Sequence, residues 1–116
     1  MNILIAPDKF KGSLTAHQVC EAVAEGIRSK HTSWSIIRSP LADGGEGTCE
    51  ILTNASGGKI NKVKVRDPLF REIETSYGLS REGATAFIEM ASASGLQLLK
   101  GSERNPRLTS SVGTGD

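Results

Sequence analysis

Acidic residues follow or end three short apolar stretches of the chain, and this shared position suggests one common site. Asp8 follows the first stretch, Asp43 comes just after the second, and Glu89 ends a later one. If these stretches are strands of an open α/β sheet, their carboxyl ends lie along one edge, where ligands bind. We therefore expect the three carboxylates to face a common site.

The loop Ala42-Asp43-Gly44-Gly45-Glu46-Gly47-Thr48 lies between a predicted strand and a predicted helix. Its glycines leave the backbone open to an anion, and the first N–H groups of the helix make the position weakly positive. Its acids suit Mg²⁺ carrying phosphates better than a bare phosphate. We therefore predict phosphoryl chemistry, with Asp43 and Glu46 as metal ligands and Gly44, Gly45, Gly47 and Thr48 in substrate binding.

The loop after the first apolar stretch is basic. Lys9 and Lys11 could face the carboxylate or phosphate of a small acidic substrate, and the Ser13 hydroxyl could donate to the same group. Phosphoryl transfer requires acids that hold a metal and basic groups against the phosphates, and the chain has candidates for both. It has neither a GxxxxGK[ST] loop nor a full GxGxxG, so ATP would bind by another arrangement.

Each candidate also has a purely structural explanation. Asp8 could cap a turn after proline, the lysines could be solvated surface charges, and Asp43 and Glu46 could simply start a helix. Glu89 is harder to explain in this way, because a carboxylate beside buried strand residues needs a partner or an ion. The remaining candidate ligands are expected to be ordinary surface histidines and core thiols: His17, His31, Cys20 and Cys49.

The apolar patterns predict an α/β fold with a mixed sheet and flanking helices. Thr15 and Gln18 form a potential capping box for a helix that runs to about residue 29 or 30, and a second helix is expected from about residue 48 to 55. The predicted strands are 2–7, 33–38, about 60–65, 73–79 and 85–89, with a turn at Asp67-Pro68 and a short helix after Glu89. The later strands alternate apolar and polar residues, which indicates antiparallel pairing with one solvated face.

Composition excludes several classes of partner. The 116 residues are 37% hydrophobic and 23% charged, as expected for one ordinary domain or part of one. A net charge of +1 and an aromatic content of 4% argue against binding to nucleic acid or to an anionic membrane. The apolar N-terminus is too short to span a bilayer and lacks a basic leader, so we expect a cytoplasmic protein.

Four segments together resemble the bacterial glycerate kinase family, the type that makes 2-phosphoglycerate. They occur in the family's order and extend over essentially the whole chain: Ile5-Ala6-Pro7-Asp8-Lys9-Phe10-Lys11-Gly12-Ser13-Leu14, Ala42–Thr48, Ile88-Glu89-Met90-Ala91-Ser92-Ala93-Ser94-Gly95-Leu96 and Gly113-Thr114-Gly115. The resemblance implies ATP-dependent phosphorylation of D-glycerate with Mg²⁺. It also implies a two-domain α/β enzyme several times longer, of which these residues form the N-terminal portion.

The resemblance carries site residues with it. It implies site positions at Asp8, Lys9, Lys11, Ser13, Asp43, Glu46, Glu89 and Ser94. Among the candidates, we infer catalytic roles for Asp8, Lys11 and Asp43, substrate-binding roles for Lys9, Ser13, the glycine loop, Glu89 and Ser94, and metal binding by Asp43 and Glu46. We expect the basic residues and Ser13 to lie near an anionic group, and Glu89 to have a supporting role.

The last residues read as the start of a glycine loop without the helix that should follow, so we expect a chain cut within that loop. An inactive fragment that acts at most as a binding or interaction domain is the alternative to the kinase. A different small-acid kinase or phosphatase with the same loops is a further alternative. The sequence leaves the oligomeric state open.

Overall fold

The computed structural model describes residues 1–116, and they form two compact units, Met1–Asp43 and Gly44–Asp116. We describe each unit by itself. Both combine helices with strands, which confirms the predicted α/β class. We expected one mixed sheet. Instead, the first unit has a parallel pair of strands and the second unit has an antiparallel sheet.

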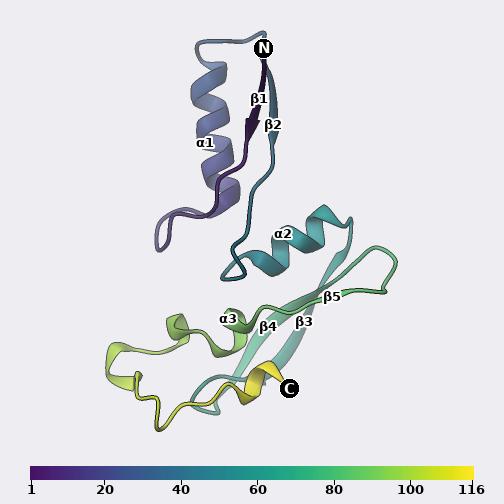
Figure 1. The fold of residues 1–116 in the computed structure, drawn as a ribbon. Helices are drawn as coiled ribbons and strands as arrows, with labels where there is room; N and C mark the ends of the chain where they lie inside the picture. Colours follow the sequence, from purple (N-terminus) through teal and green to yellow (C-terminus); the bar gives the residue numbers. More distant parts are fainter. The chain divides into compact units, whose positions relative to one another are not determined.

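The first unit is a strand, a helix and a second strand (Figure 1). β1 (Asn2–Ile5) pairs in parallel with β2 (Ser35–Arg38), and α1 (Ala16–Arg28) connects them. Parallel neighbours need a long crossover, and the helix provides it. Because Ile5 pairs with Arg38, the carboxyl ends of both strands lie at the same edge.

α1 starts where the sequence predicted. The Thr15 side chain accepts the Gln18 N–H (3.2 Å) and the Gln18 side chain accepts the Thr15 N–H (2.8 Å), which completes the capping box. The apolar face of the helix then packs on β1, with Ile5, Cys20 and Ala24 fully or nearly buried. This small core fixes the carboxyl end of β1.

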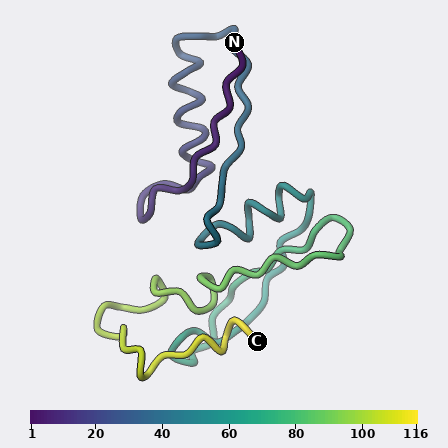
Figure 2. Tube along the Cα trace, in the orientation of Figure 1, coloured from purple at the N-terminus to yellow at the C-terminus, as the bar shows by residue number.

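The second unit is an antiparallel sheet that carries a helix. β3 (Lys59–Arg66), β4 (Glu72–Leu79) and the very short β5 (Ala86–Phe87) pair in that order, and α2 (Thr48–Ala55) packs on β3, β4 and β5. The chain continues through α3 (Met90–Ser94) and then forms short 3₁₀ turns joined by loops, which can be followed along the trace in Figure 2. These turns are Leu96–Leu98, Gly101–Glu103 and Val112–Thr114.

α2 lies unusually close to β4. Thr53 is fully buried on α2, and its Oγ1 donates to the Cys49 carbonyl (2.6 Å). A Cβ atom at Gly78 on β4 would lie 1.7 Å from that Oγ1, so only glycine allows this approach. A larger residue at position 78 would therefore require Thr53 or α2 to move.

A buried carboxylate organises the predicted turn between β3 and β4. Asp67 is 2% exposed, and its Oδ1 accepts the N–H groups of Leu69 (2.8 Å) and Arg71 (2.9 Å). The Arg71 guanidinium also pairs with this carboxylate. Burial by itself would raise the pKa of Asp67, but the hydrogen bonds from Arg71 and Leu69 outweigh it and lower the pKa.

This lowered pKa predicts an acid-dependent loss of stability. The unfolded carboxyl titrates near about 3.9, above its folded pKa, so its contribution is complete above that range and is lost as the pH falls through the folded pKa. We expect Asp67→Asn to flatten the fall in urea midpoint between about pH 5 and pH 2. Glu72→Gln, which removes an exposed pair with Lys64, is the control and should leave that fall unchanged. An equally steep fall in Asp67→Asn would contradict the prediction.

The helices of this chain are all too short or too polar to cross a membrane.

Candidate functional site

Backbone hydrogen bonds extend the pairing of β1 and β2 beyond both strands. The Ser39 N–H donates to the Ile5 carbonyl (2.8 Å), and the Leu41 N–H donates to the Pro7 carbonyl (2.9 Å). The loop after β1 and the loop after β2 therefore run side by side as they leave the sheet. As a result, Asp8 and Asp43, which are far apart in sequence, reach the same place.

Lys9 joins these two acids. Its ammonium lies 2.8 Å from Asp43 Oδ1 and 3.7 Å from Asp8 Oδ1, and its side chain is only 16% exposed. The Asp43 side chain is 58% exposed. The sequence prediction that Asp8 and Asp43 lie together is confirmed, with Lys9 as the cation between them.

This cluster combines a partly buried ammonium with an exposed carboxylate, and each has a distinct use. The Lys9 ammonium gives Asp43 a positively charged partner. The exposed part of the Asp43 side chain remains accessible to a hydroxyl group or a cation. Asp8 also has the structural role that the sequence left open, because its Oδ1 accepts the N–H of Lys9 (2.7 Å).

The other two predicted residues of the first loop lie on an exposed turn. Phe10 and Leu14 pair across it, and Gly12 takes a φ of 74° in its centre. Lys11 and Ser13 are both exposed on this turn. Both side chains are therefore accessible from solvent.

The glycine loop belongs to the second unit from Gly44 onward. Gly44 and Gly47 have φ values of 92° and 91°, a left-handed conformation that favours glycine. Glu46 is exposed on this turn. The hydroxyl oxygen of Thr48, at the start of α2, is buried and has no hydrogen-bond partner.

The start of α2 already holds an anion. Oε2 of Glu89 accepts the N–H of Gly47 (2.9 Å) and the N–H of Cys49 (3.2 Å), and Glu89 is 8% exposed. The N–H groups that we expected to face a ligand are therefore bound to this carboxylate. Glu89 does have the partner that its burial requires, and the partner is the helix.

Ser94 forms a second pair of groups in this unit. Its Oγ lies 2.7 Å from Oγ1 of Thr114, which brings α3 to the terminal glycine loop. Gly113 packs so closely on β3 that a Cβ atom would lie 1.7 Å from the Arg66 carbonyl oxygen. The Arg66 side chain then pairs with Asp116, and this hydrogen-bonded pair lowers the pKa of Asp116 to about 2.

The predicted residues therefore form separate groups. Asp8, Lys9 and Asp43 meet in the first unit, whereas the glycine loop with Glu89 and the Ser94–Thr114 pair belong to the second. Convergence of all three acids on one site stays a prediction. Sequence reasoning did not name Thr114 as a site residue, although its glycine segment was among those that carried the family resemblance.

Within this chain, no three histidine, cysteine or acidic side chains are placed to hold a metal ion. Asp43, one of the two predicted ligands, is paired with the Lys9 ammonium. The residues present therefore do not form a metal cage of their own. Both cysteines are free, buried thiols, as expected, and burial raises the pKa of Cys49.

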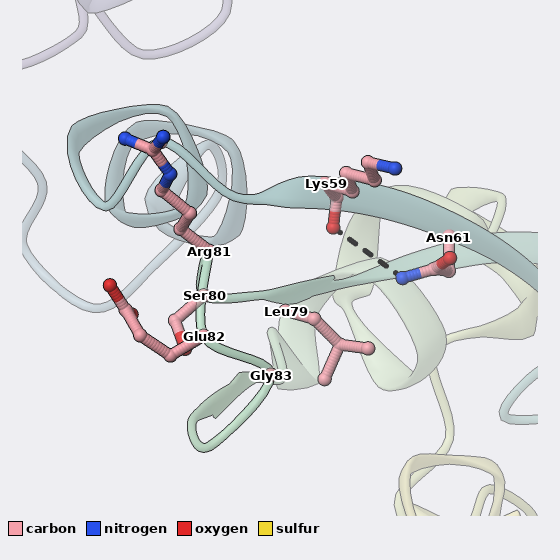
Figure 3. Close-up of a pocket in the computed structure, with 8 residues that line it drawn as sticks. Lys59, Asn61, Leu79, Ser80, Arg81, Glu82 and Gly83 are labelled. Carbon is pink, nitrogen blue, oxygen red and sulfur yellow. Dashed lines mark hydrogen bonds between the residues drawn. The ribbon is translucent and has the colours of Figure 1, made fainter.

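A surface pocket of about 470 Å³ lies elsewhere in the second unit (Figure 3). It is found beyond the C-terminal end of α2, whereas Glu89 binds the N-terminal end. In the close-up, Arg81 and Glu82 project from the turn after β4, and the Asn61 side chain reaches the Lys59 carbonyl oxygen. None of the predicted site residues lines this pocket.

Comparison with known proteins decides the family. The family model described as the glycerate kinase family matches residues 3–116. The chain belongs to the glycerate kinase family. A glycerate kinase of Haemophilus influenzae is 46% identical over the whole chain, and a glycerate 2-kinase of Escherichia coli K12 is 44% identical over the same length. The chain covers only 31% and 30% of these two proteins.

A solved glycerate kinase structure agrees with this assignment. A crystal structure from Salmonella typhimurium LT2, assigned as a glycerate kinase 2, matches 99% of this chain with a TM-score of 0.78 and 45% sequence identity. This chain covers 31% of that structure. The family resemblance and the α/β fold class predicted from the sequence are thus confirmed.

Proposed function

We propose that these residues are the N-terminal portion of an enzyme that transfers the γ-phosphoryl group of ATP to D-glycerate and forms 2-phosphoglycerate. We use the term complete kinase for a protein that contains these residues and the further residues present in the longer relatives. Membership of the glycerate kinase family supports the reaction class. Within the chain, the Asp8–Lys9–Asp43 cluster is the observation that carries the proposal.

The cluster suits a small hydroxy acid. In the proposed reaction, the substrate hydroxyl oxygen bonds to the γ-phosphorus, the bond to the oxygen of ADP breaks, and the hydroxyl proton passes to a carboxylate. Asp43 is proposed for that carboxylate because its side chain is more than half exposed beside Lys9. Lys9, Lys11 and Ser13 would bind the anionic groups of glycerate or of the phosphates.

The glycine loop would contribute backbone and hydroxyl groups. Gly44 and Gly47 have left-handed backbone conformations, and as glycines they add no side chain to the loop. The buried Thr48 hydroxyl has no hydrogen-bond partner. We propose that Gly44, Gly45, Glu46 and Thr48 contact a substrate, and that Ser94 and Thr114 present hydroxyl groups to the same ligands.

We propose that Mg²⁺ binds together with the nucleotide and not in a preformed site made only of protein side chains. Magnesium in kinases keeps several waters and binds through one or two carboxylates together with substrate phosphates, where it neutralises negative charge. Asp43 and Glu46 are the proposed carboxylates. In this proposal, the remaining chain of the complete kinase supplies much of the nucleotide site.

The test compares the complete kinase with the 116-residue chain alone. With ATP, Mg²⁺ and D-glycerate, we expect the complete kinase to release ADP and to give a product that enolase converts directly, as 2-phosphoglycerate requires. The 116-residue chain should release none. Other hydroxy acids serve as control substrates. Equal transfer to those acids, or glycerate-dependent ADP release from the short chain, would refute the proposal.

A further inference from the structure

We propose that Glu89 is a positioning residue that fixes the glycine loop at the start of α2, rather than a residue that contacts substrate. This inference rests on the proposed function, because it assigns a role within the same site. Its basis is a pair of hydrogen bonds that link residues far apart in sequence. Both bonds end on one carboxylate oxygen, Oε2, which receives the N–H groups of Gly47 and Cys49.

α2 has no local cap, which is why a distant side chain can take that position. The N-cap residue is Gly47, which has no side chain and a φ of 91°. In contrast, α1 is capped by its own Thr15 and Gln18. The first N–H groups of a helix need acceptors, and a negative charge there also stabilises the helix dipole. Glu89 meets both needs from the segment that follows β5.

A second bond ties the same two segments together. The Cys49 thiol donates to the Phe87 carbonyl oxygen (3.2 Å), two residues before Glu89. Residues 47–49 are therefore held by residues 87–89 through a side chain and through the backbone. With Glu89 only 8% exposed, its carboxylate is occupied by this contact and is shielded from solvent.

Substitutions at position 89 can separate the effect of the Glu89 charge from the effect of its hydrogen bonds. A glutamine at position 89 has an amide oxygen that can accept both N–H groups, whereas alanine has no acceptor. We call Glu89 a clamp if it acts only by accepting the Gly47 and Cys49 N–H groups. A clamp should therefore tolerate glutamine. A residue that binds a cation or a substrate hydroxyl through its charge should not.

The experiment compares Glu89→Ala and Glu89→Gln in the complete kinase. For Glu89→Ala, we expect the Gly47 and Cys49 amides to exchange hydrogen at least about tenfold faster, and KM for D-glycerate to rise about tenfold with a smaller change in kcat. Glu89→Gln should keep both the exchange rates and KM within about threefold of wild type. Glu50→Ala, which removes an exposed acid from the first turn of the same helix, is the matched control and should change each by less than about threefold.

The proposal is overturned if Glu89→Gln raises KM or lowers kcat as much as Glu89→Ala does, or if the amides in Glu89→Ala remain protected. If the alanine variant does not fold, the glutamine variant decides alone: normal exchange with normal KM supports the clamp, and normal exchange with a raised KM refutes it. A wild-type protein without glycerate kinase activity would refute the proposed function only, because the exchange measurement still tests the clamp.

Discussion

Asp43→Asn in the complete kinase is expected to lower kcat with D-glycerate by about 10²-fold or more, the loss typical of removing a charged group that acts on the reacting atoms. Asn keeps the size of the side chain but removes the charge that faces Lys9 and, in the proposed reaction, the substrate hydroxyl. Steady-state kinetics with ATP and Mg²⁺ held in excess would measure the effect.

The stability of the same variant makes the result specific. Asp8 remains 3.7 Å from the Lys9 ammonium in this variant, and the lost Asp43 carboxylate is 58% exposed. Its loss should therefore cost about 1 kcal/mol or less, and Asp43→Asn should unfold close to the wild-type temperature. Glu74→Gln is the matched control, because it removes an exposed carboxylate 2.6 Å from the Lys62 ammonium. It should alter neither kcat nor stability. A kcat within threefold of wild type for Asp43→Asn would remove Asp43 from the catalytic residues.

Gly78→Ala should produce a large loss of stability. The new methyl group would lie 1.7 Å from Thr53 Oγ1 and 2.9 Å from Thr53 Cβ, so α2 must move away from β4. Overpacking of this kind costs about 1–3 kcal/mol in the free energy of unfolding. Urea denaturation, with a thermal scan beside it, would measure the loss.

Two further variants test the cause. Gly26→Ala adds a methyl group on α1 where nothing lies within 4 Å, and it should stabilise by about 0.5–1 kcal/mol because alanine favours a helix interior. Adding Thr53→Ala to Gly78→Ala removes the closest atom and should recover part of the loss. If Gly78→Ala is as stable as wild type, the close approach of α2 to β4 is not needed for the fold.

Local sequence signals predicted most helices and strands. The capping box at Thr15, the proline and glycine turns and the alternating strands each depend on residues within a few positions of one another, and the structure confirms them. β5 is the least accurate case. It spans only Ala86–Phe87 instead of residues 85–89, because the following residues leave the sheet and Glu89 turns to α2.

The division into two sheets lay beyond these local signals. The patterns indicate which segments form strands, but they do not state which strands are neighbours. The pairing of β1 with β2 and of β3 with β4 depends on contacts between distant segments. The same is true of the Ser94–Thr114 pair, whose members are 20 residues apart.

The amino-acid sequence alone determined the family, the α/β class and the presence of an acid after each apolar stretch, because these depend on residue types and short spacings. Only the tertiary structure decided what each acid faces. Continued pairing beyond β1 and β2 brings Asp8 and Asp43 to Lys9, whereas the packing of α2 directs Glu89 to backbone N–H groups. The physical reason is that the fold determines which donors lie near each carboxylate, and a buried carboxylate such as Glu89 requires them.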